Sequence, residues 1–321
     1  MASTTYTGVQ YRTITAAHMA AEFPSVSGLI ASGAVRVDPN PPFKGGGGIS
    51  YNVPHFLEIT GADVVATAAT DGTRNAISTY KDVGPIVHRE YGVGVEDIAQ
   101  YVIGSDSNIG GEIERQAPQY WAKRLAVALY SVAKGGFTTD GVFAISQLMV
   151  DSGSTFNRAA VENIIKMDGV GDQWPDYRIW IMHSKQFAQA LTDGIVNYME
   201  AGAFAERLLN TGNVPTIFGK QVVVDDNIVE TDGTTYLCKA NAFYLGFQAD
   251  VRVEYQRDSS LGGGTDEYWL RTGFMPHVFG LTYAGSALPT NTTLATAASW
   301  TLSQSTDYKL HRIIKVKFVN T

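Results

Sequence analysis

Histidine and cysteine are the residue types that most often bind metals or act in catalysis, and the chain has six of the first and one of the second. No two histidines have the spacing with which one helix binds a metal ion, so the pattern of a zinc hydrolase is absent. Cys238 lies within an apolar run that predicts a strand, which favours a buried core thiol over a nucleophile. A single cysteine also excludes disulfide scaffolds and zinc ribbons. The histidines are His18, His55, His88, His183, His277 and His311.

The glycine-rich stretches do not match the loops that bind phosphate groups. Gly219-Lys220 resembles the end of a phosphate-binding loop, but Val214 replaces its first glycine and Gln221 replaces the serine or threonine that follows the lysine. Gly92-Val93-Gly94 lacks the third glycine of a dinucleotide motif. No Gly-x-Ser-x-Gly motif of a serine hydrolase occurs. We therefore expect no cofactor and no catalytic residue, and a binding or structural role is favoured over an enzyme.

Two short polar groups remain as candidates for chemistry. Asp225-Asp226-Asn227 could bind a hard cation, but three short polar residues after a strand are typical of a turn. His183-Ser184 pairs a base with a nucleophile in sequence only. We expect these two residues to end a strand, with Ser184 as the N-cap of the next helix.

The composition limits the partners of the chain. Its 24 basic and 31 acidic residues give a net charge of −7 without a basic cluster, which argues against a dedicated nucleic-acid binder. The start of the chain does not resemble a signal peptide. Residues 272–306 contain no acidic residue, lysine or arginine, but their Thr, Ser, Asn, Pro and Gly content argues against a membrane span. Only 17% of residues are charged, which favours extensive contacts with other chains.

The first 47 residues predict an extended arm. A short helical pattern lies near Ile14 to Phe23, and a stretch rich in Ser, Gly and Pro follows it. Because proline fixes φ and glycine frees it, this segment is not expected to hold a core of its own.

Residues 48–90 predict a long hairpin that projects from the body. Residues from Ile49 onward alternate between apolar and polar, and Pro54 confines this strand to an edge or a bulge. A second apolar run at Ile86 to His88 predicts the returning strand. The residues between them are rich in turn-forming types, so residues 61–84 are expected to form the tip.

Residues 106–134 form the strongest helical pattern, with apolar residues at three- and four-residue spacing. Ser105 to Ser107 supply an N-cap, and Gly135-Gly136 a stop. Pro118 interrupts the pattern, so the helix either kinks or restarts there.

After Gly153 the chain alternates between helix and strand and predicts an α/β block. One helical face ends at Met167, and strands are expected at 177–182, 221–224, 236–239 and 242–247. Alternating residues at 251–255 and 268–272 predict a second hairpin with one buried face. Residues 313–318 predict a final strand.

This order of elements resembles the major capsid proteins of tailed bacteriophages, which have the HK97-like fold. Six short stretches carry the resemblance. Residues 119–125 (QYWAKRL) are similar to the centre of the family's spine helix, and residues 181–185 (IMHSK) to a strand-to-helix step of its axial domain. Residues 218–226 (FGKQVVVDD) are similar to a strand with an acidic turn. Arg257-Asp258, residues 271–274 (RTGF) and residues 277–281 (HVFGL) are similar to the return hairpin of the peripheral domain.

The resemblance implies an α+β fold with five parts. These are an N-terminal arm (1–47), an extended β-hairpin or E-loop (48–90), a long spine helix (106–134), a peripheral domain (91–152 and 251–290) and an α/β axial domain (153–250 and 291–321). It also implies self-assembly into pentamers and hexamers that form an icosahedral head in the virion, around non-specifically packaged double-stranded DNA. Scaffolding, portal and decoration proteins are further partners of such a chain, whose assembly occurs in the host cytoplasm, with no membrane involved.

Two sets of residues are expected to matter for such a role. Tyr120, Trp121 and Leu125 should pack the spine helix against the body. The second set comprises the candidate contacts with other subunits, which are Tyr51, Asp71, Arg74, Lys81 and Arg89.

Two other functions stay open: the shell of an encapsulin-like nanocompartment with a protein cargo, and a hydrolase or transferase with an α/β core.

Overall fold

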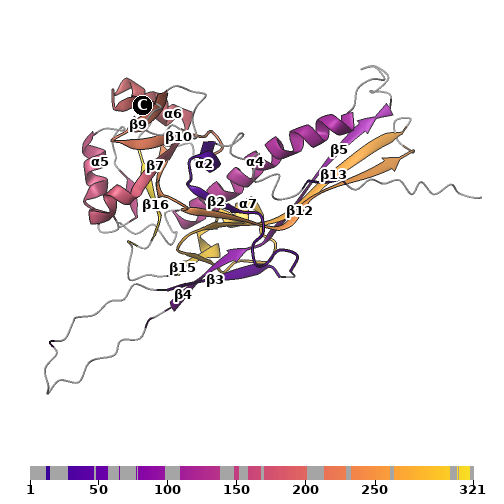
Figure 1. The fold of residues 1–321 in the computed structure, drawn as a ribbon, viewed down its shortest axis with the longest axis horizontal. Helices are drawn as coiled ribbons and strands as arrows, with labels where there is room; N and C mark the ends of the chain where they lie inside the picture. The colour runs from indigo at the N-terminus through magenta and orange to yellow at the C-terminus, as the bar shows by residue number, and fades with distance from the viewer. Residues whose placement is uncertain are drawn as a thin grey trace, which may run out of the picture.

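The computed structural model describes residues 12–14, 28–46, 48–56, 65, 77, 79–97, 109–137, 148–151, 158–167, 170–200, 213–228, 233–260, 264–303, 309 and 311–318. These residues form three β-sheets around one long helix (Figure 1). The fold is therefore mixed α+β, as the sequence predicts. No helix in this described part is long and apolar enough to cross a membrane.

A seven-stranded sheet forms one end of the molecule, with α5 (Arg158–Ile165) and α6 (Ser184–Thr192) beside it (Figure 1). Its central strand, β7, is buried at every position but one, because a run of apolar residues can be covered on both faces. β10 pairs with β7 in parallel, and β11 pairs with it antiparallel. The strand order is β6 (Met149–Asp151), β16 (Ile313–Lys317), β11 (Thr234–Lys239), β7 (Tyr177–Met182), β10 (Lys220–Val224), β9 (Asn213–Ile217), β8 (Val196–Glu200).

A second sheet is built on the long pair β12 (Phe243–Asp258) and β13 (Thr265–Val278). β5 (Val87–Glu96) pairs with β13, while β1 (Arg12–Ile14) and β2 (Val35–Asp38) pair with β12. The residues of β12 that lie nearest the seven-stranded sheet are buried, and those at its far end are exposed. The helix α4 (Ile109–Gly136) lies along this sheet (Figure 1).

A four-stranded sheet completes the body, in the order β15 (Trp300–Leu302), β14 (Leu281–Tyr283), β4 (Thr79–Pro85) and β3 (Ser50–Phe56). β3 is an edge strand, so Pro54, which has no N–H to donate, is tolerated in its middle. This agrees with the edge position predicted from Pro54. The short helices α2 (Gly28–Ala31), α7 (Asn291–Leu294), η1 (Gly171–Asp176) and η3 (Ala297–Ser299) connect the larger elements.

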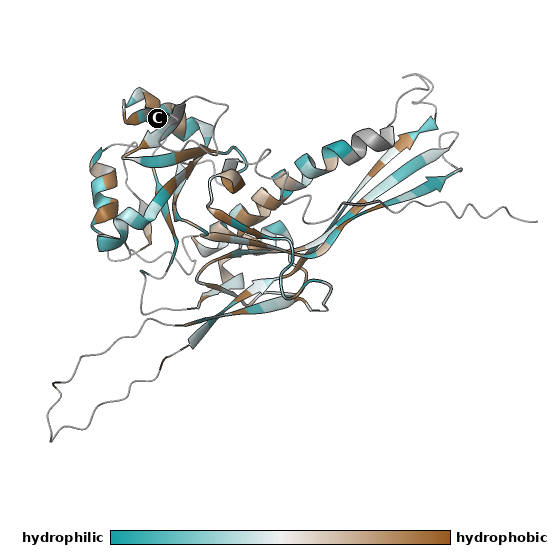
Figure 2. Cartoon of the chain, in the orientation of Figure 1, coloured by the Kyte–Doolittle hydropathy of each residue, from teal (hydrophilic) through white to brown (hydrophobic). Residues whose placement is uncertain are grey.

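The hydrophobic core runs from the seven-stranded sheet along α4 to the base of the long pair. Trp121, Leu125 and Tyr130 of α4 belong to one buried cluster with Trp180 of β7 and Phe243 of β12. Figure 2 shows apolar residues where the elements meet, and polar residues toward the free ends of β12 and β13. The described elements thus share one core, from which two pairs of strands extend.

The predicted long helix is present as α4, and it is continuous through Pro118. The restart considered at this proline therefore does not occur. Gly135 lies at the end of α4, where Leu294 and Trp300 leave no room for a side chain. A Cβ added at this position would lie 2.3 Å from Leu294 O and 2.6 Å from Trp300 Nε1. The glycine therefore permits α4 to pack against α7 and β15, in addition to marking the helix end. The N-cap expected at residues 105–107 lies outside the described residues.

Residues 28–46 pack against the body, which contradicts the expectation of a segment without core contacts. Leu29 and Ile30 are fully or almost fully buried, and Phe43 is buried in a small cluster with Ile86 and Met275. β2 pairs in parallel with β12, a partner some two hundred residues away that sequence alone does not reveal. Of the helix expected near residues 14–23, the first residue belongs to β1 and the rest lies outside the described residues.

The returning strand of the hairpin begins earlier than expected. It is β4, which pairs with β3 from Ser50↔Pro85 to Phe56↔Thr79, whereas residues 87–96 form β5 in another sheet. Residues 79–84 therefore do not belong to the tip. Gly84 is buried so closely on Met275 that an added Cβ would lie 2.5 Å from its sulfur. The rest of the expected tip lies outside the described residues except positions 65 and 77.

The observed strand pairing also differs from the expected α/β block, at its C-terminal boundary near residue 250 and in the segment 291–321. The strands expected at 242–247 and 251–255 are one strand, β12, because its pairing with β13 continues across two register shifts. Residues 291–302 form α7, η3 and β15, which contact α4 and β14. Residues 291–321 were expected to belong to the axial domain. Of the described residues in this range, only those of β16 join the seven-stranded sheet.

Candidate functional site

Of the five residues expected at contacts with other copies, the structure describes Tyr51, Lys81 and Arg89. Tyr51 packs within its own subunit, with its ring centroid 5.0 Å from that of Phe43. Lys81 is exposed on β4, and Arg89 is half-buried on β5. Asp71 and Arg74 lie outside the described residues. Tyr51 is half-buried against Phe43, and the contact roles of all five residues stay predictions.

The structure places the three helix residues on the side of α4 that faces the body. Trp121 is 1% exposed and Leu125 is fully buried. Tyr120 is half-buried, and its ring centroid lies 4.3 Å from that of Tyr91 on β5. The Arg124 guanidinium covers the same Tyr120 ring, 5.4 Å from its centroid.

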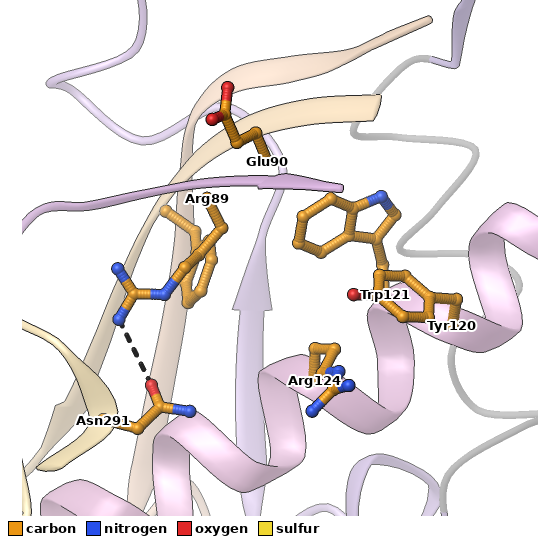
Figure 3. Close-up of a pocket in the computed structure, with 7 residues that line it drawn as sticks. Arg89, Glu90, Tyr120, Trp121, Arg124 and Asn291 are labelled. Carbon is orange, nitrogen blue, oxygen red and sulfur yellow. Dashed lines mark hydrogen bonds between the residues drawn. The ribbon is translucent and has the colours of Figure 1, made fainter. Parts of the chain in front are cut away.

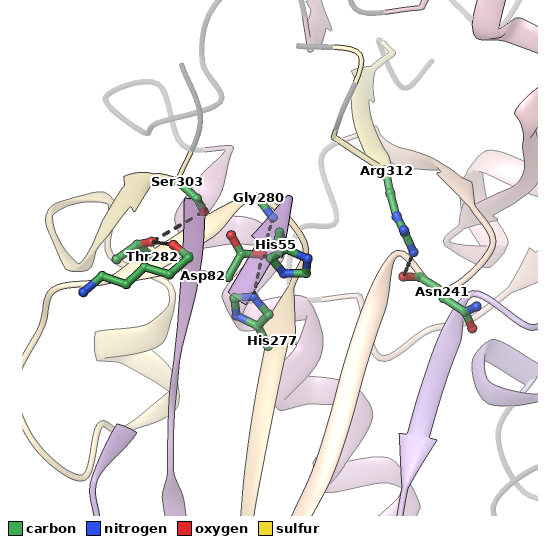
Figure 4. Close-up of polar contacts among 9 residues, drawn as sticks. His55, Asp82, Asn241, His277, Gly280, Thr282, Ser303 and Arg312 are labelled. Carbon is green, nitrogen blue, oxygen red and sulfur yellow. Dashed lines mark hydrogen bonds and ion pairs between the residues drawn. The ribbon is translucent and has the colours of Figure 1, made fainter. Parts of the chain in front are cut away.

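A buried carboxylate joins the hairpin base, which is β3 and β4, to the rest of the body. Asp82 on β4 is fully buried, and its Oδ2 lies 3.4 Å from Nε2 of His55 on β3 and 3.4 Å from Nε2 of His277 on β13 (Figure 4). The backbone N–H of Gly280 donates a hydrogen bond of 3.1 Å to the same oxygen. One carboxylate therefore links three strands of two sheets.

The environment of Asp82 favours its ionised form. Burial raises the pKa of this carboxyl, but the contacts with His277, His55 and Ser303 outweigh burial and hold the pKa well below its usual range. The arrangement is not a metal site, since no group of three or more His, Cys, Asp and Glu among the described residues is placed to hold a metal ion. We interpret Asp82 as a buried, ionised side chain with a structural role: it holds the hairpin base against the rest of the body.

Sequence reasoning misses this cluster, because positions 55, 82 and 277 have no short spacing. One signal was present in the sequence. Asp82 directly precedes the apolar and small residues Val83 to Val87, and an aspartate beside such a run is costly to bury unless it is paired. Such a residue predicts a partner of opposite charge, although it does not identify one.

The hairpin base exposes large apolar side chains. Phe56 at the end of β3 is 77% exposed, and Ile49 and Ile77 are 53% and 61% exposed. Residues of β3 alternate between exposed and half-buried, so neither face of this strand is fully covered within the subunit. Large apolar residues exposed at the ends of an edge strand are typical of surfaces that another chain covers.

A pocket of about 220 Å³ lies between α4, β5 and the start of α7 (Figure 3). Arg89 and Arg124 contribute guanidinium groups, and Tyr120, Trp121 and Phe274 contribute aromatic surface. Arg89 donates hydrogen bonds to Pro289 O at 2.7 Å and to Asn291 Oδ1 at 3.2 Å. These bonds hold one guanidinium at the pocket wall.

The phosphate-loop resemblance at Lys220 has a structural explanation. Its side chain is buried, and Nζ donates to Trp174 O at 2.8 Å and to Tyr177 O. Burial and nearby Arg178 lower the pKa of Lys220 to about 8. The amine thus binds backbone carbonyls at the end of η1, and it does not face a phosphate-binding loop.

The other candidates for chemistry also have structural roles. Nδ1 of His183 accepts a hydrogen bond from Lys185 N at 3.2 Å, so His183 caps α6, and Ser184, the expected cap, is the first helical residue. Asp225 Oδ1 accepts from Asn227 N at 2.9 Å, which confirms the predicted turn. Cys238 is fully buried, and burial raises the pKa of its thiol, as expected for a core residue.

Solved structures share this fold over most of their length. The capsid of Ralstonia phage GP4 matches with a TM-score of 0.61 at 10% identity, over 100% of this chain and 94% of that chain. The cyanophage Pam1 capsid asymmetric unit matches with a TM-score of 0.55 at 12% identity, over 92% of each chain. The structure from Mycobacterium phage Cain matches with a TM-score of 0.54 at 11% identity, over 100% and 95%.

No protein-family model matches the chain, and no curated protein matches it. At 10 to 12% identity the likeness rests on architecture, and three separate phage structures agree on it. The chain therefore has the mixed α+β fold of the HK97-like capsid proteins.

Proposed function

We propose that this chain is the major capsid protein of a tailed phage. Its copies would assemble as pentamers and hexamers into an icosahedral head that encloses double-stranded DNA. The observation that carries the proposal is the extent of the likeness, since 92 to 100% of this chain aligns with the phage structures described above. The role is structural, and the protein is a component of the virion.

The parts of the fold correspond to the parts of such a subunit. We assign the spine helix to α4, the peripheral domain to the sheet of β5, β12 and β13, and the axial domain to the seven-stranded sheet. Residues 48–90 correspond to the extended hairpin, although β5 takes residues 87–90 into the peripheral sheet. The N-terminal arm would then be residues 1–27, since 28–46 pack on the body.

Exposed apolar surface supports assembly. A soluble subunit gains little from Phe56 at 77% exposure or Ile77 at 61%, whereas a neighbouring copy that covers them removes this apolar area from water. The net charge of −7 fits a shell that packages DNA without binding it tightly. Scaffolding, portal and decoration proteins are further partners that this role would involve, with assembly in the host cytoplasm.

Purified full-length chain tests the proposal. We expect rings or closed shells in size-exclusion chromatography and negative-stain images. A hydrolase or transferase would give a small oligomer, which would contradict assembly. Shells that enclose a protein cargo and no nuclease-protected double-stranded DNA, when produced with their neighbouring genes, would instead indicate an encapsulin-like compartment.

A truncation tests the role of the hairpin. Replacing residues 58–76 with a short Gly/Ser linker leaves β3, β4 and Asp82 in place, and the cost of loop closure changes slowly with length. We expect a folded subunit, with unchanged hydrogen exchange in the seven-stranded sheet, that no longer closes shells. Normal shells would show the segment to be dispensable, and an unfolded subunit would make it part of the fold.

A further inference from the structure

The pocket between α4 and β5 concentrates positive charge. Within the part of the chain that the structure describes, Arg89 donates hydrogen bonds to neutral oxygens, those of His88 at 3.1 Å, Pro289 and Asn291. Arg124 lies over the Tyr120 ring. Among the described residues, neither guanidinium has a carboxylate partner. Because an arginine stays charged in proteins, the pocket holds two positive charges.

Glu90 also lines the pocket but does not neutralise it. Its Oε2 lies 3.2 Å from Nε of Arg271, on the opposite side of β5 from Arg89. Figure 3 shows the Glu90 carboxylate pointing away from the space between Arg89, Arg124 and Asn291. The acidic group of the pocket is thus bound elsewhere, and both arginines line the pocket, Arg89 half-buried and Arg124 exposed.

The size and lining of the pocket suit a protein side chain. Its volume of about 220 Å³ is below the roughly 300 to 1,000 Å³ of pockets that hold small molecules. At its rim Tyr91 is 41% exposed and stacks on Tyr120. Tyrosine, tryptophan and arginine are the residues that contribute most to binding at protein interfaces. Their combination here favours a protein partner.

We propose that this pocket binds a carboxylate side chain of a second copy of the chain, held by Arg89 and Arg124. The inference rests on the proposed function, because it needs assembled subunits. Each copy carries 31 acidic and 24 basic residues, so carboxylates are in excess on any neighbour. An arginine pair also suits a carboxylate, because each of its two oxygens can accept a charge-assisted hydrogen bond from one guanidinium.

A DNA phosphate fits the same charge less well. Binding along a phosphate backbone needs a continuous basic surface, because successive phosphates repel nearby carboxylates. Here the neighbouring arginine of the sheet, Arg271, lies on the opposite face from Arg89 and is paired with Glu90 and Glu254, so it does not extend the positive charge of the pocket. A single buried acceptor group from a neighbouring subunit meets only the two arginines.

Zero-length cross-linking tests the proposal directly. The variant Arg124→Lys places a primary amine at the pocket, and a carbodiimide joins an amine to a carboxylate only where the two are in contact. Shells are assembled from a mixture of heavy-isotope-labelled and unlabelled subunits, cross-linked, and digested for mass spectrometry. We expect mixed-label peptides that join position 124 to an aspartate or glutamate of another copy.

Two controls make the result specific to the pocket. Lys123 precedes position 124, is exposed, and points about 100° away around the helix, so it should not give the same cross-link. In Arg158→Lys, position 158 should join Glu162 of the same chain, because these side chains lie 3.1 Å apart. Equal cross-linking of Lys123, or only same-chain links from position 124, in shells that form normally would overturn the inference.

Charge removal gives a second readout. We expect Arg89→Gln with Arg124→Gln to fold normally and to shift the concentration needed for assembly upward by at least tenfold, with Arg158→Gln as the unaffected control. Normal assembly together with lost DNA content would overturn the inference and indicate a phosphate contact. If wild-type chain forms no assemblies at all, the proposed function fails first, and the inference fails with it.

Discussion

The seven-stranded sheet and the hairpin base are both built from strands, but only the first is covered within the subunit. β7 is buried at every position except Arg178, and β11 is buried from Thr234 to Cys238. β3, by contrast, has no fully buried residue, and Phe56 at its end is 77% exposed. The difference teaches which part is stabilised by a large apolar core and which part relies on a small apolar cluster and on the buried carboxylate of Asp82.

The first test of this contrast removes one large buried side chain from the seven-stranded sheet. Trp180 on β7 is fully buried, and Trp180→Ala should cost about 3 to 5 kcal/mol of stability, since it removes a large side chain and leaves a cavity. Chemical denaturation of the isolated subunit measures the loss. Val224→Ala on the neighbouring strand is the control, because Val224 is 41% exposed and should change stability by no more than about 0.5 kcal/mol.

The second test removes the charge at the hairpin base. Asp82→Asn should cost about 1 to 3 kcal/mol, because a neutral amide replaces the charged carboxylate that His55 and His277 contact. Hydrogen exchange should increase in β3 and β4 and stay unchanged in β7 and β11. Glu162→Gln, which also turns a carboxylate into an amide but at an exposed position of α5, should alter neither. Faster exchange throughout the seven-stranded sheet would mean that the two regions unfold together.

Acid should weaken the hairpin base through the same carboxylate. The pKa of Asp82 is lowered in the folded subunit, so its contribution is fully present above its unfolded pKa of about 4 and is lost as the pH falls toward the folded value. The stability difference between wild type and Asp82→Asn should therefore shrink as the pH drops below about 4. Thermal unfolding of both chains from pH 6 to pH 3 measures it, and a constant difference would contradict the assignment.

The smallest effect on the isolated subunit is expected at the exposed end of β3. Phe56→Ser should change subunit stability by no more than about 0.5 kcal/mol, because the ring contacts little in its own chain. The same variant should hinder assembly, which light scattering measures. A large loss of subunit stability would show that Phe56 is covered within the chain, and it would remove the contrast between the two regions.

Elements with a strong local pattern were predictable from the sequence. β7 matches the strand expected at 177–182, because an uninterrupted apolar run is typical of a strand buried on both faces. α4 matches the expected helix within a few residues, because its apolar positions repeat with the helical period. The second hairpin, β12 with β13, follows from alternation on one buried face.

Features that depend on distant partners were not predictable. β2 becomes a strand because it pairs in parallel with β12, and nothing within residues 35–38 indicates that partner. The Asp82 cluster draws on three strands of two sheets. The arginine pocket likewise joins β5 to α4, and Arg89 was expected at a contact surface without its partner residue Arg124. Tertiary neighbours decided each of these cases.

The length of β12 has a consequence for how related chains can vary. Its 16 residues, at about 3.3 Å each, span roughly 50 Å from the buried centre to the exposed end. Inserting one residue would turn every later side chain to the opposite face of the sheet, whereas inserting two would preserve the faces and lengthen the strand by about 7 Å. Changes in the reach of this strand pair should therefore accumulate in steps of two residues, matched on β13, so that the length of the pair changes in discrete increments.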